Sequence, residues 1–444
     1  MEYEIKSSTQ LKEISEVDFT PMVSAAGEPF FAFYNYFLTC DFKTLVKKDY
    51  SDFAQICNNL ESFLDDHGAR NNKYWAYFAE LIASIRNLSI ASYILRHVLD
   101  RQTDYHGGPD HAPLDGFVEE GGRTLEFLNS SLLALSKAVE EEAKRFGVEM
   151  TKEVYKSHRD IRETFFILPK NMEESRVKNK EERIVELVHK VRKVAKISSQ
   201  EDIRRETDPE KLALMVPTRI DEKKARKLKN IIHGVQSDYD TYVKNTEVER
   251  ENTDLKLLRG YISIPLHLLE MVRWISHFYE RHEDAIRQSE ETIKISAIVK
   301  KEMVLDRLIN FGYFYSDQYL QKARKISEKI LNLYVTAVQY ELPVPAKGFH
   351  ARPSTYISLI VNEHGTDVFL LVDGQRFNAK SVMNLMMAAG MIYDMGLKTV
   401  VFEGDQRVLD DLKILAEHNY CEDQEIPREL NYLRILRNVG SPVI

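Results

Sequence analysis

Long helical periodicity, with few residues that would interrupt it, is the feature that most constrains the first 340 residues. The whole chain of 444 residues has only 18 glycines and 13 prolines, the two residue types that most often end a helix. Apolar residues recur at helical spacing in residues 76–100 and 125–146, as in helices that face a core. Residues 262–279 are apolar on most sides and should lie at the centre of a bundle. We therefore predict an all-α region with hardly any strand.

Residues 171–258 are richer in charge than the rest of this region, most clearly in 181–196 and 221–229. Apolar residues still recur there at the spacing of one helix face, which argues against a disordered tail. In the first of these stretches they are Ile184, Val185, Leu187, Val188, Val191, Val194 and Ala195. Pro209 and Pro217 mark breaks in the pattern. We predict an exposed, charged helical arm or hairpin.

The run Gly-Phe-His-Ala-Arg-Pro-Ser at residues 348–354 contains the residues of a site that accepts phosphate. Proline is tolerated in the first turn of a helix, so a helix should begin near Ala351 with His350 as its N-cap. The imidazole would then lie beside free backbone amides and the positive end of the helix dipole, where an anion is stabilised. This environment favours the neutral, nucleophilic imidazole over the imidazolium. The guanidinium of Arg352 can bind phosphate oxygens that the amides of Ala351 and Arg352 do not reach.

These residues resemble the active-centre motif of HPr, the histidine phosphocarrier of the bacterial phosphotransferase system, and the likeness continues downstream. The elements expected there are a helix to Val361, a strand in 366–372, a turn at Asp373-Gly374, a second strand, a helix from about Ser381, a strand over 398–403 and a helix over 406–418. This order, β-α-β-β-α-β-α, is that of the HPr open-faced β-sandwich. The resemblance covers residues 341–422.

The resemblance implies roles for individual residues. His350 would accept a phosphoryl group and Arg352 would stabilise it. The donor would be enzyme I, itself charged by phosphoenolpyruvate, and neither a cofactor nor a metal is implied. Ser381 matches the serine that an HPr kinase or phosphorylase modifies, so it is a candidate regulatory site. The apolar docking patch for partner proteins would consist of Val382, Met383 and Met386.

We therefore predict an α+β protein in which a large all-α region precedes an HPr-like domain. The expected parts are a helical bundle in 1–170, a charged helical arm in 171–258, a second part of the bundle in 259–340, an HPr-like domain in 341–422 and a helical C-terminal tail in 423–444. A helix from Tyr319 is expected to continue through Tyr340, which leaves little linker before the first strand.

Composition and charge exclude several other classes of protein. Acidic residues outnumber Lys and Arg, 69 against 61, so the net charge does not attract nucleic acid or anionic lipid. No segment approaches eighteen uninterrupted apolar residues, and the first residues lack a basic stretch followed by an apolar core, so we expect a cytoplasmic protein without membrane insertion. The cysteines, Cys40, Cys57 and Cys421, show no CxxC spacing and should be buried thiols.

Histidines in the helical region offer another setting for a metal ion or a ligand. His97 and His277 occur in segments that share a His-x-x-acid-Arg spacing, which places histidine and carboxylate on one helix face. Two such helices, facing each other, could supply ligands from the interior of a bundle together with His267 and Glu270. His106 and His111 flank a Gly-Gly-Pro loop, which is also a setting for binding. Surface, capping and packing roles are commoner for such residues, so no metal site is predicted.

The sequence favours a phosphocarrier or regulatory protein that accepts a phosphoryl group from enzyme I on His350 and signals through its helical region to an unknown downstream protein. Such a chain is a phosphoryl carrier with a covalent phosphohistidine rather than a small-molecule enzyme. Two alternatives stay open. The HPr-like domain could serve only for docking in an unphosphorylated interaction or scaffold protein, or it could control an enzyme in the helical region.

Overall fold

The computed structural model of the chain describes residues 13–106, 112–157, 180–283, 289–335 and 337–434. The chain divides into two compact units. Unit 1 comprises residues 1–177 and 190–323, and unit 2 comprises residues 178–189 and 324–444. Two helices cross the boundary between the units, α6 (Lys180–Gln200) and α13 (Phe314–Tyr334).

Unit 1 is helical, and no strand occurs in its described residues, which confirms the predicted all-α region. The helices that lie wholly in it are α1 (Glu16–Thr39), α2 (Lys47–Asp66), α3 (Ala76–Asp100), α4 (Gln102–Tyr105), α5 (Phe117–Phe146), α7 (Pro209–Met215), α8 (Glu222–Tyr242), α9 (Glu247–Glu251), α10 (Thr253–Glu283), α11 (Glu290–Ile298) and α12 (Lys301–Asp306). A π-helical segment, Arg307–Tyr313, joins α12 to α13.

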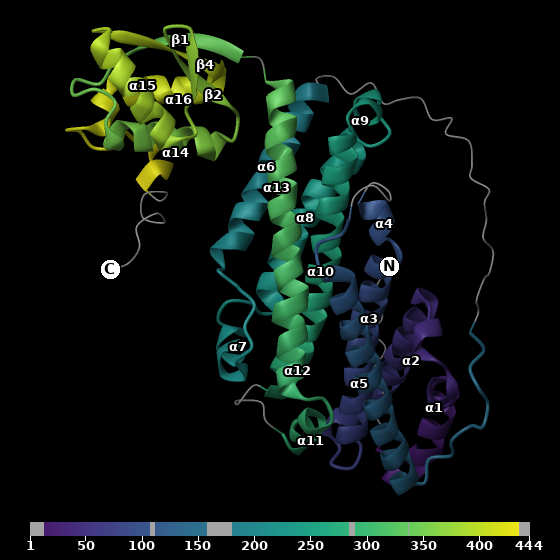
Figure 1. Cartoon of the computed structure of the whole chain (residues 1–444). Coiled ribbons are helices and arrows are strands. Elements are labelled where there is room, and N and C mark those ends of the chain that lie inside the picture. The colour runs from purple at the N-terminus through teal and green to yellow at the C-terminus, as the bar shows by residue number, and fades with distance from the viewer. Residues whose placement is uncertain (1–12, 107–111, 158–179, 284–288, 336, 435–444) are drawn as a thin grey trace, which may run out of the picture. The chain divides into compact units, whose positions relative to one another are not determined.

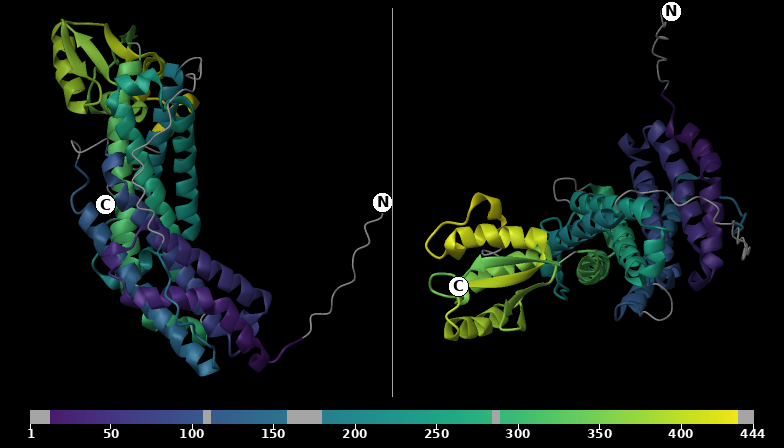
Figure 2. Two further views of the ribbon diagram at one scale, coloured as in Figure 1. Left: turned by 90° about the vertical axis from the view of Figure 1, so that its right-hand side faces the viewer. Right: turned by 90° about the horizontal axis from the view of Figure 1, so that it is seen from above.

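Helices α3 and α10 form the centre of this unit, where the sequence placed its most apolar segments. Helix α3 packs against α2, α5 and α10, and α10 also packs against α8. Figure 1 shows these long helices side by side, and Figure 2 shows them from two further directions. Between α1 and α2 the core is aromatic: the rings of Phe33 and Phe53 stack with centroids 4.2 Å apart.

The segment predicted as a charged arm contains α6, α7, α8, α9 and the first residues of α10. Helix α8 packs along α10 with Ala225, Leu228 and Ile232 buried. Lys223 and Lys227 lie on the exposed side of the same helix. The high charge of this segment is therefore the solvated face of an amphipathic helix.

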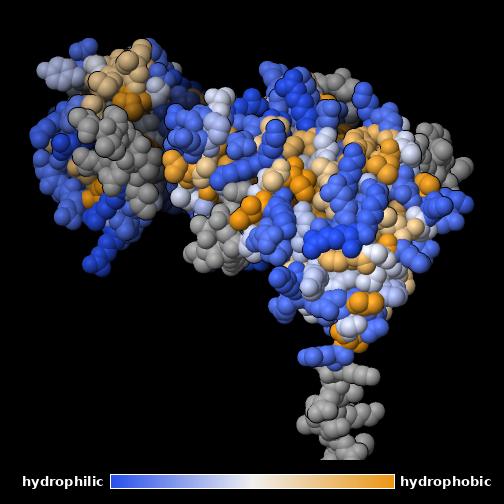
Figure 3. Space-filling model, turned by 90° about the horizontal axis from the view of Figure 1, so that it is seen from below, coloured by the Kyte–Doolittle hydropathy of each residue, from blue (hydrophilic) through white to orange (hydrophobic). Residues whose placement is uncertain are grey.

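One described helix, α3, is long and apolar enough to cross a membrane by length and composition alone. In the most apolar window of that helix 83% of the residues are buried inside the protein, which is the setting of a core helix. Hydrophilic side chains cover most of the face seen in Figure 3, with hydrophobic ones in small groups between them.

Unit 2 contains a four-stranded antiparallel sheet with strand order β1-β4-β2-β3. Its strands are β1 (Ala337–Pro343), β2 (Val368–Val372), β3 (Gln375–Asn378) and β4 (Thr399–Asp405), and the helices between and after them are α14 (Ala351–His364), α15 (Val382–Asp394) and α16 (Gln406–Glu417). The order β-α-β-β-α-β-α and the α+β class are as predicted. The first and larger part of the chain is helical, and the last part combines the sheet with α14, α15 and α16.

The core of the sheet domain lies between one face of the sheet and the three helices. Side chains alternate along the strands, so Leu370 of β2 and Phe402 of β4 are fully buried. Ile357 of α14, Leu385 of α15 and Leu412 of α16 pack into the same cluster. The opposite face carries polar pairs, which is the arrangement of an open-faced sandwich.

The expectation that a helix continues from Tyr319 through Tyr340 is wrong. Helix α13 ends at Tyr334, and β1 begins at Ala337. Val338 and Tyr340 face Gly404 and Phe402 of β4 across the ladder. Pairing with a strand sixty residues away, a non-local interaction, therefore overrides the local helical pattern.

The C-terminal tail is described only as far as residue 434. It contains one short 3₁₀ segment, Arg428–Leu430, followed by a turn and the start of a helix. Leu430 and Leu433 are buried in the core of unit 2. The rest of the tail that was expected to be helical, residues 435–444, lies outside the described part of the chain.

Two helical glycines of unit 1 should respond oppositely to alanine. A Cβ on Gly260 would lie 1.6 Å from the carbonyl oxygen of Tyr105, whereas a Cβ on Gly234, in the middle of α8, would meet nothing within 4 Å. We expect Gly260→Ala to destabilise the protein by about 3 kcal/mol through the clash, and Gly234→Ala to stabilise it by about 1 kcal/mol through helix propensity. Thermal unfolding of both variants is the measurement. A Gly260→Ala protein as stable as Gly234→Ala would contradict the packing of α4 on α10.

Candidate functional site

His350 is the N-cap of α14, as the sequence predicted. Its backbone is extended, and its Nδ1 accepts a hydrogen bond of 3.3 Å from the backbone N–H of Arg352. Pro353 is buried in the first turn of the helix. Because only a ring nitrogen without a proton can accept this bond, the lone pair of Nδ1 points at the N-terminus of α14.

The other ring nitrogen of His350 lies against a glutamate that the sequence did not indicate. Nε2 is 2.5 Å from Oε1 of Glu422, a residue 72 positions further along the chain. A carboxylate accepts hydrogen bonds, so Nε2 is the nitrogen that carries the proton. Both contacts are thus satisfied by the same neutral tautomer, with a proton on Nε2 and a lone pair on Nδ1.

The two partners differ sharply in exposure. The side chain of His350 is 44% exposed, whereas that of Glu422 is 2% exposed. The second carboxylate oxygen of Glu422 has no hydrogen-bond partner among the described residues. Burying a carboxylate with one oxygen unpaired costs free energy. The hydrogen bond with His350 therefore offsets much of the free energy that burying the carboxylate of Glu422 costs.

Arg352 is held beside the same residue. Its Nη1 donates a 2.7 Å hydrogen bond to the backbone carbonyl oxygen of Glu422. This bond uses one of the five N–H groups of the guanidinium, which leaves others for an anion placed at Nδ1 of His350. His350 and Arg352 thus form an exposed pair over the buried carboxylate of Glu422.

An unusual turn brings Glu422 to this place. Asn419, Tyr420 and Cys421 have positive φ angles of 49°, 53° and 55°. Three consecutive non-glycine residues in the left-handed region cost on the order of 1 kcal/mol each. The surrounding structure compensates, because the hydroxyl of Tyr420 donates a 2.7 Å hydrogen bond to the carbonyl oxygen of Pro343 at the end of β1. The buried ring of Tyr420 also packs edge-on against Phe349, with centroids 5.5 Å apart.

Comparison with known protein families agrees with this geometry. Residues 344–406 match the model of the PTS-HPr family, described as the PTS HPr component phosphorylation site. The chain carries an HPr-like domain at the C-terminal end of a large helical protein. The matched residues include His350, Arg352 and Ser381, and they end before the turn that carries Glu422. No curated protein and no solved structure matches the chain.

Ser381 of the HPr-like domain is the N-cap of α15, where its Oγ accepts a 3.3 Å hydrogen bond from the backbone N–H of Asn384. The predicted docking patch follows directly. Met383 is 69% exposed and Met386 is 44% exposed, while Val382 is half-buried. Two exposed methionine side chains, of a residue type that adapts its shape readily, therefore lie beside Ser381.

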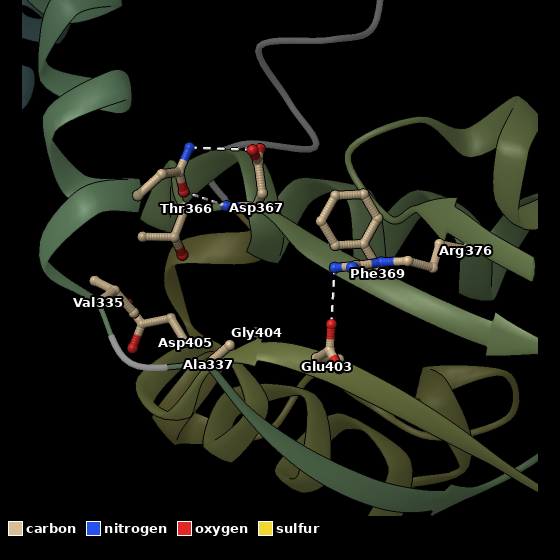
Figure 4. A pocket seen from close by; sticks show the side chains of 10 residues that line it. Val335, Ala337, Thr366, Asp367, Phe369, Arg376, Glu403, Gly404 and Asp405 are labelled. Atoms are coloured by element: carbon tan, nitrogen blue, oxygen red, sulfur yellow. Dashed lines mark hydrogen bonds and ion pairs between the residues drawn. The ribbon is translucent and has the colours of Figure 1, made fainter.

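A pocket of about 230 Å³ lies where β1 begins at Ala337, at the end of this strand away from His350 (Figure 4). Asn332, near the end of α13, forms two hydrogen bonds with Asp367: its Nδ2 donates to Oδ2 at 3.1 Å, and its Oδ1 accepts from the backbone N–H at 2.9 Å. Arg376 and Glu403 form an ion pair of 2.7 Å across the pocket wall. These polar groups are paired with one another, so they tie α13 to the domain without indicating a ligand.

The histidines of unit 1 are brought together only in part. His97 of α3 and His267 of α10 meet with ring centroids 4.7 Å apart, and the hydroxyl of Tyr105 lies 3.1 Å from Nε2 of His97. Burial, followed by the repulsion that a protonated His97 would exert, lowers the pKa of His267 to about 4. Both features describe a packed, neutral pair.

The remaining candidate histidines lie apart from this pair. His277 is hydrogen-bonded to Glu222 at 2.8 Å, and Glu270, predicted to act with His267, bonds Arg273 at 3.0 Å. His106 contacts the hydroxyl of Tyr319 at 3.0 Å. His111 lies outside the described residues. The described part of the chain contains no group of three metal-binding side chains.

Glu422 is the site residue that the sequence analysis missed. The residues that it contacts, His350 and Arg352, lie close together in the motif. Glu422 reaches them through the left-handed turn at residues 419–421, and the sequence of that turn, Asn-Tyr-Cys, does not predict this conformation. Asn419 is of a type that tolerates the left-handed region. This residue was the one available signal that the chain turns here.

Proposed function

We propose that the HPr-like domain accepts a phosphoryl group on Nδ1 of His350 from enzyme I of the phosphotransferase system, itself charged by phosphoenolpyruvate. The match to the PTS-HPr family supports a phosphotransferase-related carrier or regulatory role. The proposal that Nδ1 of His350 is the acceptor atom rests on the orientation of the imidazole ring. The lone pair of Nδ1 faces the N-terminus of α14, and the proton of Nε2 faces Glu422.

The transfer proceeds by direct displacement at phosphorus. The lone pair of Nδ1 attacks the phosphoryl group of a donor phosphohistidine, a new N–P bond forms, and the electron pair of the breaking N–P bond returns to the donor imidazole. The backbone amides of Ala351 and Arg352 and the guanidinium of Arg352 stabilise the phosphoryl oxygens. Arg352 reaches them with the N–H groups that do not bond the carbonyl of Glu422.

The output of this carrier is regulatory in our proposal. A free-standing phosphocarrier has no use for a helical region of more than 300 residues. The junction between the two is short, because α13 ends at Tyr334 and β1 begins at Ala337. We propose that the phosphorylation state of His350 is read through the helical region in the cytoplasm by a downstream protein. Ser381, beside the docking patch, offers a second site of control by an HPr kinase or phosphorylase.

His350 should be the sole acid-labile phosphorylation site. After incubation with phosphoenolpyruvate and the cognate enzyme I, mass spectrometry should find one added phosphoryl group that is lost in acid, because phosphohistidine is acid-labile and phosphoserine is not. His350→Ala should abolish the label. His364→Gln is the matched control, since His364 lies at the other end of α14 and bonds Asp411. Undiminished acid-labile label in His350→Ala would remove the assignment.

Charge at Ser381 should weaken docking of enzyme I. Ser381→Asp places a carboxylate beside Met383 and Met386, and we expect affinity for enzyme I to fall about tenfold because this charge must be desolvated against an apolar contact. Aspartate is itself a good N-cap, so α15 should stay folded. Ser381→Asn, a neutral cap, is the control and should bind normally. Calorimetric titration giving equal affinities for the two variants would show that enzyme I docks elsewhere.

Phosphorylation should alter protection in the helical region if that region reads the signal. A switch requires a difference in interaction free energy between the two states of His350. We expect hydrogen exchange of residues 190–323 to differ between fully phosphorylated and unmodified full-length protein, with His350→Ala treated identically as the control. Identical protection would exclude an intramolecular switch and assign the reading of phosphohistidine to a separate protein.

A further inference from the structure

We propose that Glu422 is a positioning residue for phosphoryl transfer: it holds His350 in the tautomer with the proton on Nε2 and stabilises the positive charge that the ring gains as Nδ1 is phosphorylated. This inference rests on the proposed function of His350. The matched family segment ends at residue 406, so the role of Glu422 follows from the geometry of this chain.

The two ring contacts of His350 select one tautomer. With the proton on Nε2, both ring nitrogens are satisfied: Nδ1 accepts from the backbone N–H of Arg352, and Nε2 donates to Oε1 of Glu422. With the proton on Nδ1, two donors would face each other at Arg352 and two acceptors would face each other at Glu422. The 2.5 Å contact with a charged carboxylate is the stronger of the two constraints. Glu422 therefore keeps the lone pair on the nitrogen that faces the helix N-terminus.

Phosphorylation of Nδ1 changes the charge on the ring of His350. When the lone pair of Nδ1 forms the N–P bond, the donor's N–P bond breaks and its electron pair leaves with the donor imidazole. The ring of His350 keeps its Nε2 proton and so becomes positively charged. A carboxylate at Nε2 is placed to stabilise that charge, and its burial strengthens the interaction because water screens it little. When His350 passes the phosphoryl group to the next acceptor, its ring is the leaving group and becomes a neutral imidazole again.

A buried carboxylate at this position costs free energy. Glu422 is buried with one oxygen unpaired, at the end of three left-handed residues. A residue present only for packing would be more stable as an apolar or amide side chain of similar size. Buried polar groups and local strain of this kind are commonest at functional sites. Exposed Asp423, the next residue, pairs only loosely with Lys347 at 3.5 Å and provides a natural contrast.

The test compares Glu422→Gln with Asp423→Asn in the full-length chain. Glutamine keeps the shape of the side chain but loses its charge, and Asp423→Asn removes a charge next to it without touching His350. The tautomer is read from nitrogen NMR spectra of protein labelled with ¹⁵N-histidine, with the signal of His350 assigned by its loss in His350→Ala. The transfer rate is read from phosphorylation by enzyme I and phosphoenolpyruvate.

We expect the native protein and Asp423→Asn to hold His350 almost wholly with the proton on Nε2, and Glu422→Gln to show a mixture of both tautomers. Transfer to Glu422→Gln should be slower by about tenfold to a hundredfold, and transfer to Asp423→Asn should stay within about twofold of native. Glu422→Asp, which keeps the charge on a shorter stem, should recover part of the rate.

The outcomes separate this proposal from the proposed function. If the NMR spectra of the native protein place the proton on Nδ1, the proposed role of Glu422 is overturned. This measurement needs no variant, so it decides the question even if Glu422→Gln does not fold. An unchanged tautomer, or a rate within about twofold of native, in Glu422→Gln would also overturn it. If no variant and no native protein is phosphorylated, the proposed function fails, while the tautomer still decides whether Glu422 orients the ring.

Discussion

The hydrogen bond between His350 and Glu422 is the interaction on which the candidate site depends. It joins the start of the first helix of the HPr-like domain to the segment that follows its last helix. The ring cannot rotate without leaving a buried carboxylate unpaired, and the carboxylate cannot move without relaxing the left-handed turn behind it. The orientation of the exposed imidazole of His350 is thus fixed by the buried part of the domain, which is how a site on the surface becomes preorganised.

The turn itself depends on two aromatic side chains. Tyr420 reaches from the turn to the end of β1 through its hydroxyl, and its ring packs on Phe349, which directly precedes His350. Phe349 in turn lies edge-on to Phe402 in the centre of the sheet. A continuous series of buried contacts therefore links the middle of the sheet to both sides of the site. Strain at residues 419–421 persists because this packing stabilises a single arrangement.

The sequence predicted those parts of the structure that local chemistry decides. Pro353 set the start of α14 and made His350 its cap, Ser381 marked the start of α15, and apolar periodicity located the central helices of unit 1. It failed where distant residues decide. The start of β1 depends on pairing with β4, and the place of Glu422 depends on a turn without glycine, so neither leaves a local pattern. The motif indicated His350, but Glu422, which contacts its ring, is found only once the chain has folded.

The direction of β1 has a consequence for how a phosphate could be sensed. The strand starts beside the junction with α13 and ends at Pro343, against the turn that carries Glu422. Six residue steps of an extended strand span about 20 Å, more than twice the Debye length of about 8 Å at physiological ionic strength. The added negative charge would be largely screened by dissolved ions before its field reached α13. Under the proposed function, information about a phosphate on His350 would then pass along the junction as a mechanical displacement through the sheet, or be carried by a second protein that spans that distance.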